Sequence, residues 1–314
     1  MVEIRQLNNL CGIDVGCTNV KMAAVIDGNL VSRRIASGDD FSRESLIEEI
    51  SRFYESFNYD FDGLGIAFSG CTVDGFAVCH TSLPCLEYLS ADDFKHLCSN
   101  VRLINDSNAT ALAGTLEFPD AKVLLGITNG TGIGCGVVIN GELFAGGTGF
   151  AGEIYGNPVL DDALNPTKVG KLCSGSKILK RMTEDLDAEK NIRIIDSASQ
   201  YMGATLVSLI HSFNPNVVYC SGGGFSFAGY FDLTKDFIEK HAYSRFLKDF
   251  TMTTSTFDPY SGCIGAMRFV RPWFWSHKRL VATFFATSLF LIFFLILLLL
   301  RFHHLIMFDI LIFV

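Results

Sequence analysis

Short apolar runs and amphipathic stretches alternate along the first 270 residues of the chain. Continuous apolar runs of this length are typical of buried strands. They predict strands over Leu10 to Val15, Leu64 to Phe68, Val101 to Ile104, Val123 to Thr128, Gly136 to Ile139 and Val217 to Cys220. Asp27-Gly28 and Asn140-Gly141 have the sequence of two-residue hairpin turns, one early in each half of the chain.

Apolar residues at helical spacing fill much of the remainder. Between Phe41 and Phe57 the apolar residues share one helix face, while most of the charged residues lie off it. Further helices are predicted over Asn108 to Leu116, Lys177 to Leu186, Asp196 to Phe213 and Phe231 to His241. This mixture, with a hairpin early in each half, predicts an α/β fold of two related domains.

The end of the chain differs in kind. Leu280 to Leu300 is an uncharged run of 21 residues, which is long enough to span a bilayer as a helix. Arg271, Lys278 and Arg279 precede the run, so the positive-inside rule places the N-terminal body in the cytoplasm, anchored to the inner membrane. A shifted reading frame through AT-rich DNA would give a similar composition. A transmembrane helix over 280–300 and a non-native tail over 270–314 therefore both stay open.

Composition and charge narrow the class of protein. Hydrophobic residues make up 49% of the chain, which allows a sizeable core, and the net charge of −8 without a basic stripe argues against a nucleic-acid partner. The ten cysteines are scattered singly, and the first residues contain no apolar segment of a signal peptide. We therefore expect a reduced, cytoplasmic protein.

Three glycine-bearing turns follow predicted strands: GIDVGCTNVK (12–21), LGITNGTGIGCGVVING (125–141) and YCSGGGFS (219–226). A P-loop, a dinucleotide fingerprint and protein-kinase signatures are all absent from the sequence. The pattern instead favours hairpin loops whose N–H groups face anionic oxygens. Thr18 and Thr131 can add hydroxyl donors, and Asp14 can hold Mg²⁺ through water.

The segment LINDSNATAL, Leu103 to Leu112, places Asp106 directly after a buried strand and at the start of a helix. An aspartate there is either an N-cap or a general base that accepts a proton from a substrate hydroxyl. Phosphoryl transfer needs in-line positioning, charge neutralisation and one such base. Asn105, beside it, can hydrogen-bond the same substrate.

With these residues the chain resembles the ROK family of sugar kinases, within the actin-like ATPase superfamily. The resemblance covers Leu10 to Phe269. It rests on the order of GIDVGCTNVK, INDSNATAL, NGTGIGCGVVINGEL, GFAGEIYG, NPNVVYCSGGG and SGCIGAM, which are similar to the family's phosphate, catalytic, sugar, adenosine and closing-helix motifs.

The resemblance implies a two-domain actin-like ATPase (ribonuclease H-like) fold with a cleft between the domains. The domains would be residues 1–118 and 119–269, followed by the tail 270–314. The implied activity is transfer of a phosphoryl group from ATP to a hexose or hexose derivative, at the C6 hydroxyl. The implied partners are a small-molecule sugar and ATP, and a homodimer, because family members often are dimers.

Carried over by position, the resemblance implies a role for each motif residue. Asp106 would be the catalytic base. Asn105 and Glu153 would hold sugar hydroxyls, and Ser69 and Gly70 would approach the sugar ring. The residues Asp14, Gly16, Thr18, Gly130, Thr131 and Gly132 would surround the phosphates and Mg²⁺, and Gly222, Gly223 and Gly224 would border the adenosine. Lys21 is left as a strand-end surface lysine or a phosphate ligand.

The chain departs from the family pattern in two places. Gly156 stands where the zinc-binding histidine is expected, and Cys173 is the one cysteine left of that module, so no structural zinc is expected. Gly170 falls near a family glutamate that contacts the sugar. These losses leave a second reading open, a non-catalytic or sugar-sensing relative. DNA binding is not expected, because the first phosphate motif begins at Gly12.

Overall fold

The computed structural model describes residues 4–38, 41–73, 76–78, 83–184 and 187–271. The predicted transmembrane helix over 280–300 lies outside these residues, and so does the alternative of a non-native tail over 270–314 apart from its first two residues. Within the described ranges, no helix is both long enough and apolar enough to cross a membrane.

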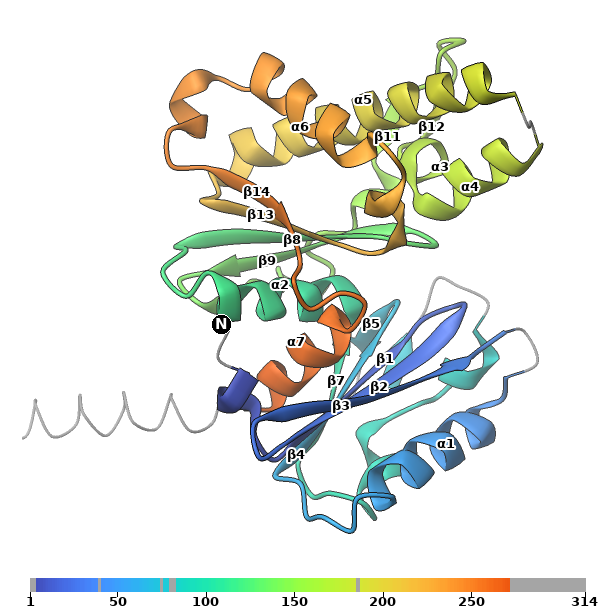
Figure 1. The fold of residues 1–314 in the computed structure, drawn as a ribbon, viewed down its shortest axis with the longest axis vertical. Helices are drawn as coiled ribbons and strands as arrows, with labels where there is room; N and C mark the ends of the chain where they lie inside the picture. The colour runs from blue at the N-terminus through green and yellow to red at the C-terminus, as the bar shows by residue number, and fades with distance from the viewer. Residues whose placement is uncertain (1–3, 39–40, 74–75, 79–82, 185–186, 272–314) are drawn as a thin grey trace, which may run out of the picture. The chain divides into compact units, whose positions relative to one another are not determined.

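The first sheet has the strand order β3-β2-β1-β4-β7. Its strands are β1 (Leu10–Val15), β2 (Asn19–Ile26), β3 (Asn29–Ala36), β4 (Gly63–Phe68) and β7 (Val101–Asn105). β1 pairs antiparallel with β2 and parallel with β4, and β4 pairs parallel with β7. Every residue of β1 and β4 is buried, which explains why both strands are apolar or glycine apart from Asp14. Helix α1 (Arg43–Glu55) packs on one face of this sheet (Figure 1).

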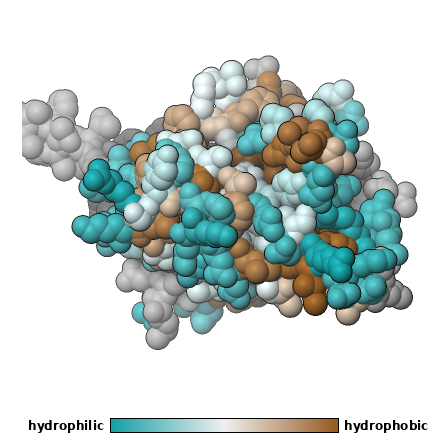
Figure 2. Space-filling view, turned by 90° about the horizontal axis from the view of Figure 1, so that it is seen from above, coloured by the Kyte–Doolittle hydropathy of each residue, from teal (hydrophilic) through white to brown (hydrophobic). Residues whose placement is uncertain are grey.

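The second sheet has the order β10-β9-β8-β13-β14. Its strands are β8 (Val123–Asn129), β9 (Ile133–Ile139), β10 (Glu142–Leu143), β13 (Val217–Ser221) and β14 (Thr251–Thr254). Helices α5 (Ala188–Phe213) and α6 (Tyr230–His241) cover one face, as Figure 1 shows. Figure 2 looks onto this end of the molecule, where hydrophilic surface is broken by separate apolar areas, and exposed apolar residues of its helices include Leu179, Ile192 and Leu233.

Helices α2 (Asp106–Glu117) and α7 (Ser261–Val270) pack against each other and against the two sheets. Glycines permit these contacts. A Cβ on Gly265 would lie 1.6 Å from the Ala109 carbonyl oxygen, and one on Gly12 would lie 2.2 Å from that of Cys263. α7 therefore lies on the first sheet although it comes after the second in sequence. The division at residues 118 and 119 stays a prediction.

The chain also contains shorter elements outside the two main sheets. β5 (Cys71–Val73) and β6 (Phe76–Val78) form one small hairpin, and β11 (Pro158–Leu160) and β12 (Pro166–Lys168) form another. α3 (Gly170–Cys173) and α4 (Gly175–Glu184) follow the second hairpin. The 3-10 turns are η1 (Ile4–Leu7), η2 (Pro84–Leu86), η3 (Ala91–Phe94), η4 (Ile154–Gly156), η5 (Gly223–Ser226) and η6 (Ser244–Leu247).

Both predicted hairpin turns are present, with positive φ at both central residues of each, as type I′ turns require. One helix boundary is wrong. α5 begins at Ala188 rather than Asp196, because the Asp187 side chain caps it by accepting from the N–H groups of Glu189 and Lys190. The first turns of α5 are largely exposed, so they show no apolar periodicity.

Candidate active site

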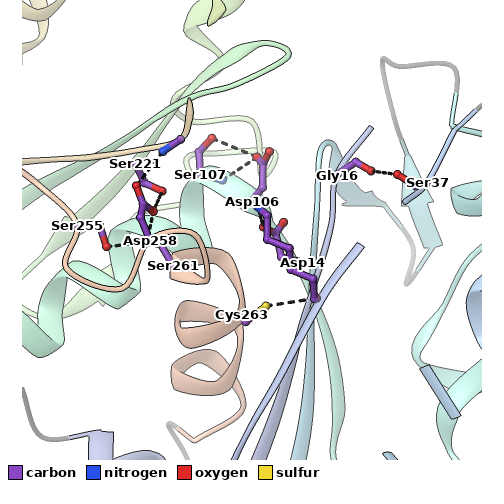
Figure 3. Close-up of polar contacts among 12 residues, drawn as sticks. Asp14, Gly16, Ser37, Asp106, Ser107, Ser221, Ser255, Asp258, Ser261 and Cys263 are labelled. Atoms are coloured by element: carbon purple, nitrogen blue, oxygen red, sulfur yellow. Dashed lines mark hydrogen bonds and ion pairs between the residues drawn. The ribbon is translucent and has the colours of Figure 1, made fainter. Parts of the chain in front are cut away.

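Asp106 is the first residue of α2 and directly follows β7. Its Oδ1 atom accepts hydrogen bonds from the Ser107 backbone N–H at 2.7 Å and from the Ser107 hydroxyl at 3.2 Å (Figure 3). The Ser107 Oγ is in turn 2.6 Å from the Thr128 Oγ1 on β8. Ser107 therefore holds the Oδ1 atom of this carboxylate in place.

The helix cap is Asn105, so the N-cap reading of Asp106 is wrong. The Asn105 Oδ1 accepts from the N–H groups of Ser107 and Asn108 at 2.9 and 3.0 Å. Its Nδ2 donates to the Gly70 carbonyl oxygen at 2.9 Å, which joins the predicted Ser69-Gly70 segment to the start of α2. The sugar-binding role of Asn105 stays a prediction and rests on the second hydrogen of its amide nitrogen.

The environment of Asp106 raises the pKa of its carboxyl to about 7. Burial is the largest cause, and the negative charges of Asp14 and Glu153 also raise the pKa, while the two hydrogen bonds from Ser107 lower it. The structure thus brings the predicted base, the predicted magnesium residue and the predicted sugar residue within electrostatic range of one another. A carboxyl with this pKa is half ionised near neutral pH, as suits a general base.

Asp14 lies at the end of β1 and forms an ion pair with Lys21 of β2, with 2.8 Å between the Lys21 Nζ and the Asp14 Oδ2. Burial is the largest single influence and lowers the pKa of Lys21, but the Asp14 carboxylate, together with Cys263 and Asp258, more than offsets this and leaves the pKa raised. The first residues of α7 back the carboxylate, since a Cβ on Gly262 would lie 2.7 Å from the Asp14 Cγ. Lys21 is therefore not a plain surface lysine.

The first glycine turn is closed by its own hydrogen bonds. The Gly16 N–H donates to the Asn19 carbonyl oxygen at 3.0 Å, and the Gly16 carbonyl oxygen accepts from the Ser37 hydroxyl at 2.7 Å (Figure 3). The Ser37 N–H donates to the Thr18 carbonyl oxygen at 3.1 Å. Gly16 therefore shapes the turn, whereas Thr18 is exposed and its hydroxyl can serve a ligand.

The second glycine turn is held by the start of α4. The Gly130 carbonyl oxygen accepts from the Ser176 N–H at 3.0 Å, and the Thr131 carbonyl oxygen accepts from the Ser176 hydroxyl at 2.6 Å. The Gly130 N–H donates to the Gly132 carbonyl oxygen at 2.9 Å. The two bonds from Ser176 direct the carbonyl oxygens of Gly130 and Thr131 toward α4, and all three bonds hold the loop in place.

The third glycine turn packs on Asn129, the last residue of β8. Gly222 has a φ of +104°, and a Cβ there would lie 2.5 Å from the Asn129 carbonyl oxygen. A Cβ on Gly224 would lie 2.5 Å from the Asn129 Cγ. The predicted phosphate loop and the predicted adenosine turn are therefore direct neighbours, and glycine is needed at both contact positions.

The Asn129 side chain is fully buried and joins three segments. Its Oδ1 accepts from the Gly175 N–H at 2.7 Å, and its Nδ2 donates to the Cys173 carbonyl oxygen and to the Tyr230 hydroxyl, each at 3.2 Å. The second loop, the start of α4 and helix α6 are thus fixed relative to one another by one amide group.

The predicted sugar residue Glu153 follows a constrained glycine. Gly152 has a φ of +90°, and a Cβ there would lie 1.6 Å from the Cys135 carbonyl oxygen. The Cys135 N–H donates to the Gly152 carbonyl oxygen at 3.0 Å. This close approach to β9 presents Glu153 as an exposed residue whose charge reaches Asp106.

Side-chain and backbone contacts hold together the region in which the family's zinc module is expected to be missing. Cys173 is buried and its thiol donates to the Val169 carbonyl oxygen, while Gly156 is exposed. The Tyr155 ring fills the space beside Gly170, where a Cβ would lie 2.0 Å from the ring. Within the described ranges no group of three or more His, Cys, Asp or Glu residues is placed to hold a metal ion. The absence of zinc stays a prediction.

Sequence patterns assign no role to three residues of this region and do not decide the role of a fourth, Lys21. Ser107 and Asn129 lie inside the motifs given above, but nothing in those motifs distinguishes them. Asp258 is marked only by an Asp-Pro pair shortly before the closing-helix motif. The contacts of Asp258 link segments far apart in the sequence, which no local pattern reports.

The site fits ATP with Mg²⁺ on three grounds. A Cβ on Gly130 or on Gly223 would meet no atom within 4 Å, so both glycine turns border open space that side chains would narrow. Asp14 offers carboxylate oxygens of the kind that Mg²⁺ binds through its hydration water. Lys21 beside it adds a positive charge that suits a phosphate.

Comparison with solved structures defines the class of fold. The structure of a ROK family protein from Streptococcus pneumoniae TIGR4 in complex with sucrose matches with a TM-score of 0.70 and 21% identity, over 86% of this chain and 99% of that one. A ROK family glucokinase from Streptomyces griseus in complex with glucose and AMPPNP matches with a TM-score of 0.65 and 20% identity, over 83% and 99%. The chain therefore has the two-domain actin-like ATPase fold, as predicted.

The family follows from the sequence. The ROK family model matches residues 10–272, and the chain belongs to the ROK family. A glucokinase of Halalkalibacterium halodurans is 26% identical over 275 residues, covering 69% of this chain and 81% of that protein. An N-acetylmannosamine kinase of Vibrio vulnificus (strain CMCP6) is 29% identical over 157 residues, which are 48% of this chain and 53% of that protein.

Proposed function

We propose that this chain, an ATP-dependent sugar kinase of the ROK family, phosphorylates the C6 hydroxyl of a hexose or N-acetylhexosamine with Asp106 as general base. The observation that carries the proposal is the environment of Asp106. Its Oδ1 is held by Ser107, its pKa is raised to about 7, and it lies within electrostatic range of Asp14 and Glu153.

In the proposed reaction the Asp106 carboxylate accepts the proton of the sugar hydroxyl. The hydroxyl oxygen forms a bond to the γ-phosphorus of ATP, and the bond from that phosphorus to the bridging oxygen breaks, which releases ADP. Ser107 keeps one carboxylate oxygen engaged, so the other faces the substrate. Glu153 and the Asn105 amide hold neighbouring sugar hydroxyls, and the Ser69-Gly70 segment approaches the ring.

The glycine turns serve the nucleotide in this proposal. Gly130, Thr131 and Gly132 surround the phosphates together with Gly16 and Thr18. Gly222, Gly223 and Gly224 border the adenosine, and Asn129 keeps them beside the phosphate loop. Asp14 would hold a hydrated Mg²⁺, which would neutralise charge on the phosphates.

The substrate class is supported by the relatives. The names of those relatives include glucokinase, N-acetylmannosamine kinase and N-acetyl-D-glucosamine kinase, and one neighbouring structure holds glucose with a nucleotide analogue. These are properties of those proteins. They favour a hexose or its 2-N-acetyl derivative as the acceptor here.

The test is coupled ADP release by the full chain with Mg-ATP across glucose, mannose, N-acetylglucosamine, N-acetylmannosamine, allose and fructose. We expect sugar-dependent turnover with at least one, and a product phosphorylated at C6 by NMR. Nucleotide and sugar binding without turnover would favour the non-catalytic reading. Phosphorylation at another hydroxyl would overturn the assignment of C6.

A further inference from the structure

The Asp258 carboxylate lies at the junction of the third glycine turn and helix α7 (Figure 3). Its Oδ1 accepts from the Ser221 hydroxyl at 2.6 Å and from the Ser261 hydroxyl at 2.7 Å. Its Oδ2 accepts from the Gly222 N–H at 3.2 Å. One side chain thus holds the end of β13, the first glycine of the turn and the first residue of α7.

These contacts continue into a buried chain of hydroxyl groups. The Ser261 Oγ is 2.6 Å from the Ser255 Oγ, and the Tyr219 hydroxyl donates to the Glu117 carboxylate and is also in hydrogen-bond contact with the Ser255 hydroxyl. Both residues are buried, with 0% of the surface of Tyr219 and 1% of the surface of Ser261 exposed. This series of hydrogen bonds ends at Glu117, which is the last residue of α2. Asp106 is the first residue of the same helix.

Helix α7 links Asp258 to Asp14. Ser261 begins α7, and the next residue, Gly262, lies against the Asp14 carboxylate, with 2.7 Å from a built Cβ to the Asp14 Cγ. Asp258 is therefore bonded on one side to the turn at Gly222 and on the other to the helix that backs Asp14. A single carboxylate group therefore connects the turn to the helix.

The conformation of Gly222 explains why such an anchor is needed. Its φ of +104° and the contact of its Cβ position with Asn129 show that the turn is both unusual in conformation and closely packed. Charge-assisted hydrogen bonds to a carboxylate are stronger than neutral ones. The bonds that Asp258 accepts from Ser221 and Gly222 therefore help to keep the turn in this conformation.

We propose that Asp258 is a positioning residue for the nucleotide, which holds the glycine turn 222–224 at a fixed place relative to Asp14 and helix α7. It acts through Gly222, Ser221 and Ser261, and it has no role in sugar binding. The inference rests on the proposed function in one respect, that the turn borders the adenosine.

The experiment compares Asp258→Asn with the unaltered chain. The amide replaces an acceptor with a donor, so at least one of the three bonds is lost. We expect the Kd for a non-hydrolysable ATP analogue, measured by calorimetry, to rise about tenfold, which is the effect of losing one charge-assisted bond. The Kd for glucose, N-acetylglucosamine and N-acetylmannosamine should change by less than about twofold, and KM for ATP should rise more than kcat falls.

Two further variants keep the test decisive. Ser221→Ala and Ser261→Ala each remove one donor to Asp258 and leave the carboxylate, so each should give a smaller rise in the nucleotide Kd. Asp187→Asn is the matched control, because it makes the same chemical change at the cap of α5 and asparagine caps a helix equally well. It should leave both Kd values unchanged.

An unchanged nucleotide Kd in Asp258→Asn overturns the inference. A parallel rise in the Kd for sugar and for nucleotide, with a lowered Tm, also overturns it, because that result describes a general loss of structure. Nucleotide binding by the unaltered chain without turnover of any sugar would refute the proposed function alone. In that case the calorimetric comparison still decides the role of Asp258.

Discussion

The ammonium group of Lys21 lies 2.8 Å from the Oδ2 of Asp14 across the antiparallel pair β1–β2. The two side chains are only 24% and 13% exposed, so solvent screens the pair much less than it screens a surface pair. The pair holds the predicted magnesium residue in place before any ligand arrives.

Lys21→Met should lower the free energy of unfolding by about 2 kcal/mol, because it leaves the mostly buried Asp14 carboxylate without its counter-charge. Urea unfolding measures this. Lys180→Met is the control, since Lys180 and Glu184 form an exposed pair at 3.6 Å whose loss should cost less than about 0.5 kcal/mol. If the two substitutions lowered the free energy of unfolding equally, burial of the Lys21–Asp14 pair would contribute nothing to stability.

Asp106→Asn should reduce sugar-dependent ADP release by about a thousandfold, because an amide cannot accept the hydroxyl proton. Asparagine has the same shape, so the Kd for the sugar should change by less than about threefold by calorimetry. Asp196→Asn makes the same change on the surface of α5 and should leave turnover intact. Turnover that persists in Asp106→Asn would remove Asp106 from the role of base.

The rate should depend on pH through the raised pKa of Asp106, which is about 7. Below that pH the carboxyl is protonated and cannot accept a proton, so kcat/KM should fall by about tenfold for each further pH unit. Ser107→Ala removes a hydrogen bond that lowers this pKa, so the acidic limb should move to higher pH by about half a unit to one unit.

Ser199→Ala is the matched control for that shift. Ser199 is also a buried helical serine, and its hydroxyl donates to the Asp196 carbonyl oxygen, remote from the site in sequence. The pH profile of this variant should coincide with that of the unaltered chain. A Ser107→Ala profile that does not move, or moves to lower pH, would contradict the assignment of the titrating group.

Gly152→Ala should destabilise the protein by more than about 3 kcal/mol, because its Cβ would lie 1.6 Å from the Cys135 carbonyl oxygen and its φ is +90°. Gly156→Ala, four residues later, is the control, since its Cβ would meet no atom within 4 Å. Thermal unfolding should show a large loss of Tm for the first and almost none for the second. Similar Tm values would mean that the backbone at Gly152 can shift at little cost.

Much of the fold could be predicted from the sequence because burial leaves a clear local pattern. β1 was predicted with its observed bounds, Leu10–Val15, since all its residues are buried and apolar or small apart from Asp14. The hairpin turn at Asp27-Gly28 was predicted because a type I′ turn requires positive φ at both positions. The short strand β14 was missed, because Thr251–Thr254 has little apolar character.

The candidate site was predictable only in part. Glycine and aspartate motifs marked Asp14, Asp106 and the three turns, and glycine is required where a turn packs closely on a neighbour, as Gly222 and Gly224 do on Asn129. The side-chain links could not be predicted, since the hydrogen bond from the Tyr230 hydroxyl to the Cys173 carbonyl oxygen spans 57 positions in the sequence. The sequence could not show that Asn105, rather than Asp106, caps α2, because both residue types favour the N-cap position.

The position of α7 has a consequence for how the protein is made. The face of the first sheet that carries Gly12 and Gly65 is covered by Cys263 and Ala266, so strands synthesised early wait for a helix synthesised late. During translation this apolar face has no cover until residues 261–270 have left the ribosome. A chain cut before Ser261 would lack this helix altogether, so the apolar face of its first sheet would stay uncovered and would favour aggregation.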